Sequence, residues 1–209
     1  MKKIKKIIKS ILQFIRRIKL KNRNVSIISN NCWGAFVYQR FGIKYNSPFI
    51  GLFLFAPDYI RLLKNFEDTI QNELIFIDAN SSKYIKNIKD MNMVNKYPIA
   101  KIDENIEIHF LHYKSEEEAR VKWKKRVKRI NYDNMLVKFC DRDECTEQHI
   151  KEFDNLQFKN KICFSSKKYK EYESVVTFDE LIGRPYVENE WKIYTKYIDI
   201  VKILNSINI

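Results

Sequence analysis

The chain has 209 residues, of which 45% are hydrophobic and 14% aromatic, and these values exclude an intrinsically disordered chain. Its formal charge is +13, but residues 1–23 hold ten Lys or Arg and no Asp or Glu. The other residues carry 29 basic against 26 acidic side chains, a net charge of only +3. The body therefore lacks the basic bias that is typical of nucleic-acid binding, and we expect no nucleic-acid partner.

Residues 1–20, MKKIKKIIKSILQFIRRIKL, predict an amphipathic helix. Apolar residues recur every three or four positions, at Ile4, Ile7, Ile8, Ile11, Leu12, Ile15 and Ile18. Charges interrupt every apolar run, which argues against a signal peptide or a membrane span. We expect the segment to lie on an anionic membrane surface. The alternative is that this helix packs on the body of the protein.

The stretch Val25–Gly42 predicts a buried strand, a polar turn and a helix. The turn, Ser29–Asn31, would present free backbone N–H groups at the helix end whose dipole favours anions. We expect a phosphate or carboxylate group of a substrate to dock there. The local alternative is that Asn31 only caps the helix. The substrate-binding candidates in this stretch are Ser29, Asn30, Asn31, Trp33 and Gly34.

The next elements alternate between apolar runs and helical spacing. Phe49–Phe55 predicts a second buried strand, with Gly51 inside it as a mark of a bulge or a close backbone approach. Pro57–Ile70 predicts a helix with proline in its first turn, and Leu74–Ile77 a short strand.

Residues 97–114 predict an antiparallel hairpin with arms Tyr97–Ile102 and Ile106–Tyr113. Side chains alternate along the second arm, so His109 and His112 point to opposite faces. The two histidines therefore do not form a metal-binding pair.

Ser115 and Glu118 form a capping-box pattern that predicts a helix to about Ile130. The outer face of this helix is strongly basic. Arg126 and Arg129 either belong to this solvated face or point into a site and clamp a phosphate.

The last third of the chain predicts three more strands, Met135–Cys140, Lys161–Phe164 and Val175–Phe178, and a closing helix from Glu188. Polar turns follow three of the predicted strands, at Ser29–Asn31, Asp141–Asp143 and Ser165–Ser166. In a mainly parallel sheet these turns lie on one edge, where ligands bind in open α/β folds.

Two groups of residues are candidates for chemistry. Asp141 and Asp143, with Arg142 between them, form a DRD turn whose carboxylates can share a divalent cation such as Mg²⁺ or Mn²⁺ and neutralise a departing diphosphate. Acids at this position also simply stabilise the start of a helix. Cys32 and His112 can form a nucleophile and base pair, and the alternative is a half-buried cysteine beside Trp33.

The four cysteines, Cys32, Cys140, Cys145 and Cys163, include no CxxC pair and suggest no disulfide framework. We expect reduced thiols in a reducing compartment.

Three long runs resemble a bacterial family, domain of unknown function nineteen-nineteen, whose members are often described as exopolysaccharide or capsule biosynthesis proteins. They are SIISNNCWGAFVYQRFGIKYNSPFIGLF, IHFLHYKSEEEARVKWKKRVKRIN and DNMLVKFCDRDECTEQHIKEFDNLQFKNKICFS, and the resemblance spans roughly residues 24–185. The family usually has a second glycine where this chain has Ala35, and often a glycine where it has Glu144. The resemblance implies an α/β fold and a link to surface-polysaccharide gene clusters.

The expected fold is a three-layer α/β sandwich with a mostly parallel sheet and an antiparallel hairpin, formed by one domain over residues 24–209 behind the basic segment 1–23. The expected function is that of a peripheral membrane protein of exopolysaccharide or capsule biosynthesis at the inner, cytoplasmic face of the bacterial membrane. We expect it to be a transferase acting on a nucleotide-activated or lipid-linked sugar. The alternative is a non-catalytic carbohydrate-binding or scaffold protein of the same machinery.

Overall fold

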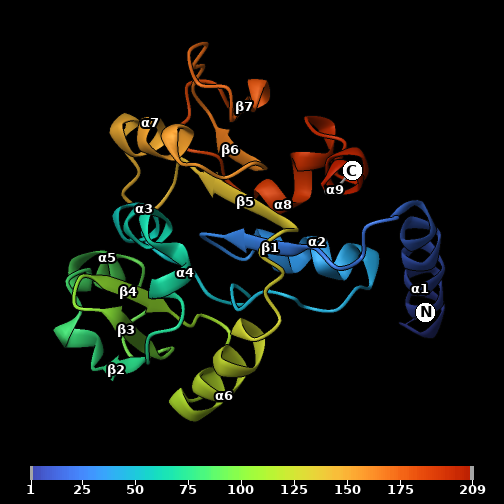
Figure 1. Cartoon of the computed structure of the whole chain (residues 1–209). Coiled ribbons are helices and arrows are strands. Elements are labelled where there is room, and N and C mark those ends of the chain that lie inside the picture. The colour runs from blue at the N-terminus through green and yellow to red at the C-terminus, as the bar shows by residue number, and fades with distance from the viewer. Residues whose placement is uncertain (1, 208–209) are drawn as a thin grey trace.

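Two β-sheets lie side by side in the computed structural model, which describes residues 2–207 (Figure 1). The larger sheet has the order β1-β5-β6-β7 and is parallel throughout. The smaller sheet, β2-β3-β4, is antiparallel. The strands are β1 (Ser26–Ser29), β2 (Ile75–Ile77), β3 (Ile99–Asp103), β4 (Ile106–His109), β5 (Met135–Cys140), β6 (Lys161–Ser165) and β7 (Val175–Thr177).

Helices cover both faces of the parallel sheet because its strands are apolar on both sides. Ile28 faces a core shared with α3 and α7, whereas its neighbour Ile27 faces the core that contains α2, α8 and α9. This arrangement confirms the predicted three-layer α/β fold. The bounds of these helices are α2 (Trp33–Phe41), α3 (Ala56–Lys64), α7 (Glu147–Asn155), α8 (Glu190–Ile193) and α9 (Ile200–Ser206).

The predicted hairpin forms β3 and β4, and the other predicted strands are present except one. Phe49–Phe55 is an extended connector, in which only Phe53 bridges to His109 of β4 through two backbone hydrogen bonds of 2.9 Å. Gly51 has φ +71°, a left-handed conformation that interrupts a regular strand. Leu54, three residues after Gly51, donates its N–H to the Asn30 carbonyl at 2.9 Å. This connector therefore links the end of β1 to the smaller sheet.

Side-chain caps set several helix boundaries. Ser115 accepts a hydrogen bond from the Glu118 N–H at 3.2 Å and starts α6 (Glu116–Val127), as predicted. The predicted closing helix is broken into α8, a 3₁₀ turn (Tyr194–Lys196) and α9. Asp199 starts the second piece by accepting hydrogen bonds from two N–H groups of α9, those of Val201 and Lys202. Two short helices, α4 (Phe66–Thr69) and α5 (Ile85–Asp90), complete the body.

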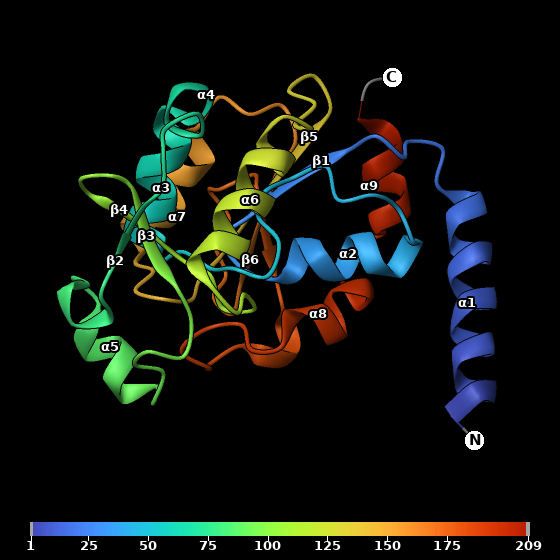
Figure 2. The same ribbon diagram turned by 90° about the horizontal axis from the view of Figure 1, so that it is seen from below.

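The N-terminal helix α1 (Lys2–Lys19) stands at one side of the body, beside the end of α2, and projects away from both sheets (Figure 2). None of the helices formed by residues 2–207 is both long enough and apolar enough to cross a bilayer.

Candidate functional site

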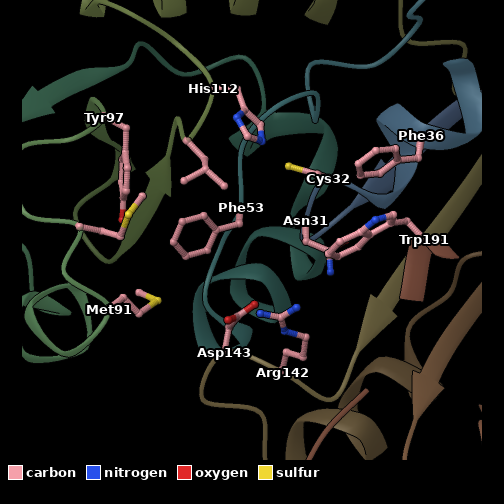
Figure 3. Close-up of a pocket in the computed structure, with 12 residues that line it drawn as sticks. Asn31, Cys32, Phe36, Phe53, Met91, Tyr97, His112, Arg142, Asp143 and Trp191 are labelled. Atoms are coloured by element: carbon pink, nitrogen blue, oxygen red, sulfur yellow. The ribbon is translucent and has the colours of Figure 1, made fainter. Parts of the chain in front are cut away.

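A cavity of about 460 Å³ opens at the carboxyl ends of β1 and β5, between the parallel sheet and the loops of the smaller one. The turn after β1 contributes Asn31 and Cys32, and the turn after β5 contributes Arg142 and Asp143 (Figure 3). This is the edge at which open α/β sheets bind ligands. The remaining lining is mainly apolar and comes from the connector, the smaller sheet and its loops, α2 and α8: Phe36, Phe53, Met91, Met93, Tyr97, Leu111, His112 and Trp191.

The two carboxylates of the DRD turn lie in different surroundings. Asp141 is buried and accepts hydrogen bonds from the N–H of Ser166 (2.6 Å), the hydroxyls of Ser165 and Ser166 (both 3.0 Å) and the N–H of Val187 (2.8 Å). Both of its oxygens are thus engaged in holding two loops together. The turns after β5 and β6 therefore do meet at one edge, as expected, but through a structural carboxylate.

Asp143 instead lines the cavity. Its backbone is left-handed, with φ +56°, and the following Glu144 has φ +64°. Glycine adopts this left-handed conformation most easily, and here two consecutive non-glycine residues adopt it. The Asp143 carbonyl accepts the N–H of Ala56 at 2.8 Å, which fixes the turn to the start of α3. Across residues 2–207 there is no cluster of three or more His, Cys, Asp or Glu able to hold a metal ion, so the shared cation remains a prediction.

Arg142 and Asp143 bring two opposite charges into the cavity (Figure 3). Burial raises the pKa of the Asp143 carboxyl, and the positive charge of Arg142 offsets this only in part. The Arg142 guanidinium lies 5.4 Å from the ring of Tyr186, and its Nε is buried without a hydrogen-bond partner among the described residues. A carboxyl with a raised pKa beside a partly unsatisfied guanidinium is typical of a functional site.

Asn31 links the cavity to a buried charge network. Its Nδ2 donates to Glu190 at 2.8 Å and to the sulfur of Cys140 at 3.2 Å, and its Oδ1 accepts the Trp33 N–H at 3.1 Å. Asn31 therefore caps the first N–H of α2 from the position before the N-cap residue Cys32, close to the role that the local alternative supposed, while one side of it still faces the cavity.

Ser29 and Asn30 are completely buried, so a ligand in solvent does not reach them in this conformation. Trp33 is also buried, with its ring against Phe164 and Tyr194 at 5.4 Å each. Gly34 brings α2 against β1, since an added Cβ would lie 3.1 Å from a methyl group of Ile27. Of the candidates in this stretch, the structure thus brings Asn31 and Cys32 to the cavity and puts the other four in the core.

Cys32 and His112 both face the cavity, from the turn before α2 and from the end of the hairpin (Figure 3). No hydrogen bond within residues 2–207 joins them, and the Cys32 sulfur lies 3.8 Å from the Leu52 carbonyl oxygen. Burial, and secondarily the charge of Glu190, raise the pKa of the Cys32 thiol to about 11. The thiol is therefore protonated at neutral pH, which does not favour an activated nucleophile.

A second cavity of about 270 Å³ adjoins the first and shares Cys32, Phe36 and His112 with it. It is lined on its far side by Lys122 and Arg126 of α6. Arg126 donates to the Tyr113 hydroxyl at 2.6 Å. Arg129 lines neither of these cavities and donates to the Tyr45 carbonyl at 3.4 Å. One of the two predicted arginines thus reaches this region and the other lies elsewhere.

Two aromatic residues that line the cavity, Phe36 and Trp191, are not among the candidates from the sequence. Phe36 of α2 and Trp191 of α8 stack with their ring centroids 5.4 Å apart and their planes at 12°. Phe36 is 38% exposed, which is unusual for a phenylalanine on a helix that packs on a sheet. In the sequence, Phe36 continues the apolar spacing of α2, and no local signal marks it as a surface residue.

Comparison with known proteins places the chain in a family. The family model described as Domain of unknown function (DUF1919) matches residues 3–208. An uncharacterized protein of Haemophilus influenzae is 38% identical over 156 residues, which cover 75% of this chain and 68% of that protein. The match spans nearly the whole chain, including every residue of both cavities, and the chain therefore belongs to the DUF1919 family.

Proposed function

We propose that this protein is a transferase of bacterial surface-polysaccharide assembly, which acts on a nucleotide-activated or lipid-linked sugar in the larger cavity. The observation that carries the proposal is that Arg142 and Asp143 share one cavity with the stacked pair of Phe36 and Trp191. A charged pair and an aromatic platform at the edge of a parallel sheet suit a substrate with a phosphate and a ring.

The aromatic platform supports a ring-shaped ligand. Aromatic faces pack against the C–H face of a sugar, and they stack on nucleobases with a gain of about 1–3 kcal/mol per base. Phe36 and Trp191 come from α2 and α8, so a ring held by them would lie on the side of the cavity that carries Cys32.

Arg142 supports a phosphate group. Its guanidinium forms paired hydrogen bonds with phosphate oxygens more readily than a lysine does. Its buried Nε has no partner among the described residues and gains one when an anion binds. Positive charge at this place stabilises the diphosphate that leaves when a sugar is transferred.

Asp143 supports proton transfer. The raised pKa of its carboxyl makes it a better proton acceptor than an ordinary aspartate. In a transfer, the acceptor hydroxyl would give its proton to Asp143. The hydroxyl oxygen would bond to the sugar carbon as the bond between that carbon and the diphosphate oxygen breaks.

The alternative is a non-catalytic carbohydrate-binding protein of the same machinery. The protonated state of the Cys32 thiol favours it, because a binding protein needs no activated nucleophile. Both functions predict that a ligand binds in this cavity. Only the transferase would convert the bound sugar to a product.

The test is a thermal-shift and calorimetry panel with UDP-glucose, UDP-N-acetylglucosamine, GDP-mannose and geranyl diphosphate, each with and without Mn²⁺. Arg142→Gln should weaken binding of the ligand that shifts the wild type by roughly tenfold or more. Arg129→Gln, outside both cavities, is the matched control and should bind normally. Asp143→Asn should still bind but lose transfer of the sugar to a saccharide acceptor.

Two results would contradict the proposal. Equal binding by Arg142→Gln and the wild type would remove Arg142 from the site. Binding by the wild type, with no sugar transfer or hydrolysis in any condition, would leave the carbohydrate-binding alternative.

A further inference from the structure

The apolar side of α1 is open to solvent along the described part of the helix. Seven large apolar side chains are between 43% and 65% exposed there: Ile7, Ile8, Ile11, Leu12, Phe14, Ile15 and Ile18. With about 100° of rotation per residue they occupy a single arc of roughly 160°. We call these seven residues the apolar stripe. They make up more than half of the large exposed apolar side chains of the described residues, so this surface needs a partner.

The helix contacts the body through its opposite side. Gln13 donates to the Gln39 carbonyl at 2.6 Å, and its side chain lies against Gly42. Leu20, just after the helix, is fully buried. On a helical wheel, Gln13 and Leu20 lie about 180° and 160° from the centre of the stripe. The attachment to the body therefore turns the stripe away from the rest of the molecule.

The charge of the segment identifies a suitable partner. Residues 1–23 carry ten Lys or Arg and no acid, and this segment accounts for most of the charge of +13. An anionic lipid surface satisfies both properties, because it accepts apolar side chains below the headgroups and attracts basic side chains at them. A nucleic acid would match the charge but leave the apolar stripe exposed.

We propose that α1 is a membrane-docking helix, which lies in the surface of an anionic bilayer with the apolar stripe inserted and holds the body beside the membrane. A second copy of the chain is the competing occupant of the stripe. Pairing two such helices brings two acid-free basic segments together, and this repulsion disfavours it. The proposal is independent of the sugar transferase function, since its test reads lipid binding alone.

The experiment uses the purified full-length protein and vesicles of phosphatidylcholine, with and without phosphatidylglycerol. Ile11→Ser/Ile15→Ser changes two stripe residues that are 53% and 47% exposed. The matched control, Ile75→Ser/Ile182→Ser, makes the same chemical change at body positions that are 67% and 49% exposed. We expect the wild type and the control to sediment with the anionic vesicles. The stripe variant should bind at least roughly tenfold more weakly, with an unchanged thermal midpoint.

A second readout reports insertion directly. Phe14→Trp places an indole at a stripe position that is 65% exposed. Its emission should shift to the blue with phosphatidylglycerol vesicles and stay unchanged with phosphatidylcholine alone. Equal vesicle binding by the stripe variant and the wild type would overturn the proposal. So would a lipid-free dimer, detected by sedimentation velocity, that the stripe variant dissociates while vesicle binding is absent.

Discussion

Lys138 of β5 and Glu190 of α8 form an ion pair inside the protein, with side chains that are 0% and 1% exposed. Asn31 joins them, with its Oδ1 3.3 Å from the Lys138 ammonium and its Nδ2 donating to Glu190 at 2.8 Å. The pair therefore ties three chain segments together directly behind the cavity. Two of these segments carry the cavity residues Asn31 and Trp191. The shape of the proposed site thus depends on an ion pair whose two residues are not among those that line the cavity.

Breaking this ion pair from one side should be costly. Lys138→Met leaves the Glu190 carboxylate buried and unpaired, and its second oxygen already has no hydrogen-bond partner among the described residues. We expect a loss of about 3–5 kcal/mol in the free energy of unfolding, measured by urea denaturation. The double variant Lys138→Met/Glu190→Gln removes both charges and should recover much of this loss. Equal stability of the single and double variants would show that the buried charge is not the cause.

At position 31, the side-chain N–H₂ that donates to Glu190 should matter more for stability than the oxygen that accepts the Trp33 N–H. Asn31→Asp keeps an acceptor for the Trp33 N–H but places a negative group where an N–H₂ donated to Glu190. Asn31→Ala loses the cap and the donor without adding charge, and should cost about 1–2 kcal/mol. We expect Asn31→Asp to be the less stable of the two in denaturation at neutral pH. The reverse order would mean that the cap dominates.

The sequence was sufficient to predict elements whose signals are local. The period of apolar residues predicted β1, α2 and the hairpin, and Ser115 predicted the start of α6. The strand predicted at Phe49–Phe55 does not form, because Gly51 adopts a left-handed conformation. Among the described residues, the only β-bridge of this segment is the one between Phe53 and His109. An apolar run does not distinguish a buried strand from a buried connector.

The site was harder to predict because its parts come from distant segments. Turn positions in the sequence singled out Asn31, Cys32 and Asp143, which all line the cavity, but did not distinguish Asp141 from Asp143. Asp141 has a structural role because its carboxylate accepts hydrogen bonds from Ser165, Ser166 and Val187. These residues are distant in the sequence, and only the folded chain brings them close to Asp141. The partnership of Lys138 with Glu190 likewise joins residues 52 positions apart.

His109 should make the protein less stable in mild acid. Burial lowers the pKa of His109 to about 3, and the charge of Lys83 adds to this effect. Between pH 6.5 and about 3 the unfolded chain therefore binds a proton that the folded protein excludes. The contribution of His109 to the free energy of unfolding should fall by about 1.4 kcal/mol for each pH unit in this range as the pH is lowered.

The test of this pH dependence is His109→Phe, which keeps a ring in the stack with Phe53 at 4.7 Å. The variant loses the contact of Tyr97 with Nδ1, a cost that does not depend on pH. Its stability should be flatter between pH 6.5 and 4 than that of the wild type. His112→Asn, which removes an imidazole from an exposed position, is the matched control. Identical slopes for His109→Phe and the wild type would refute the assignment to His109.

Cys32 should react slowly with alkylating reagents despite its place in the cavity. The pKa of its thiol is raised from 9.0 to about 11, so the thiolate fraction at neutral pH is roughly a hundredfold below that of an ordinary thiol. We expect iodoacetamide to label Cys32 correspondingly slowly, with a rate that keeps rising above pH 9. Mass spectrometry of the labelled peptide separates this signal from the other cysteines, and Cys32→Ser identifies it.

The same measurement decides whether Cys32 and His112 act as a nucleophile and base. Since no hydrogen bond within residues 2–207 joins these side chains, His112→Asn should leave the labelling rate unchanged at every pH. In an activated pair, the imidazole lowers the thiol pKa, so the rate would reach its plateau near neutral pH and fall on removal of His112. That result would make Cys32 the reacting group of the cavity. An unchanged rate leaves Asp143 as the side chain best suited to proton transfer there.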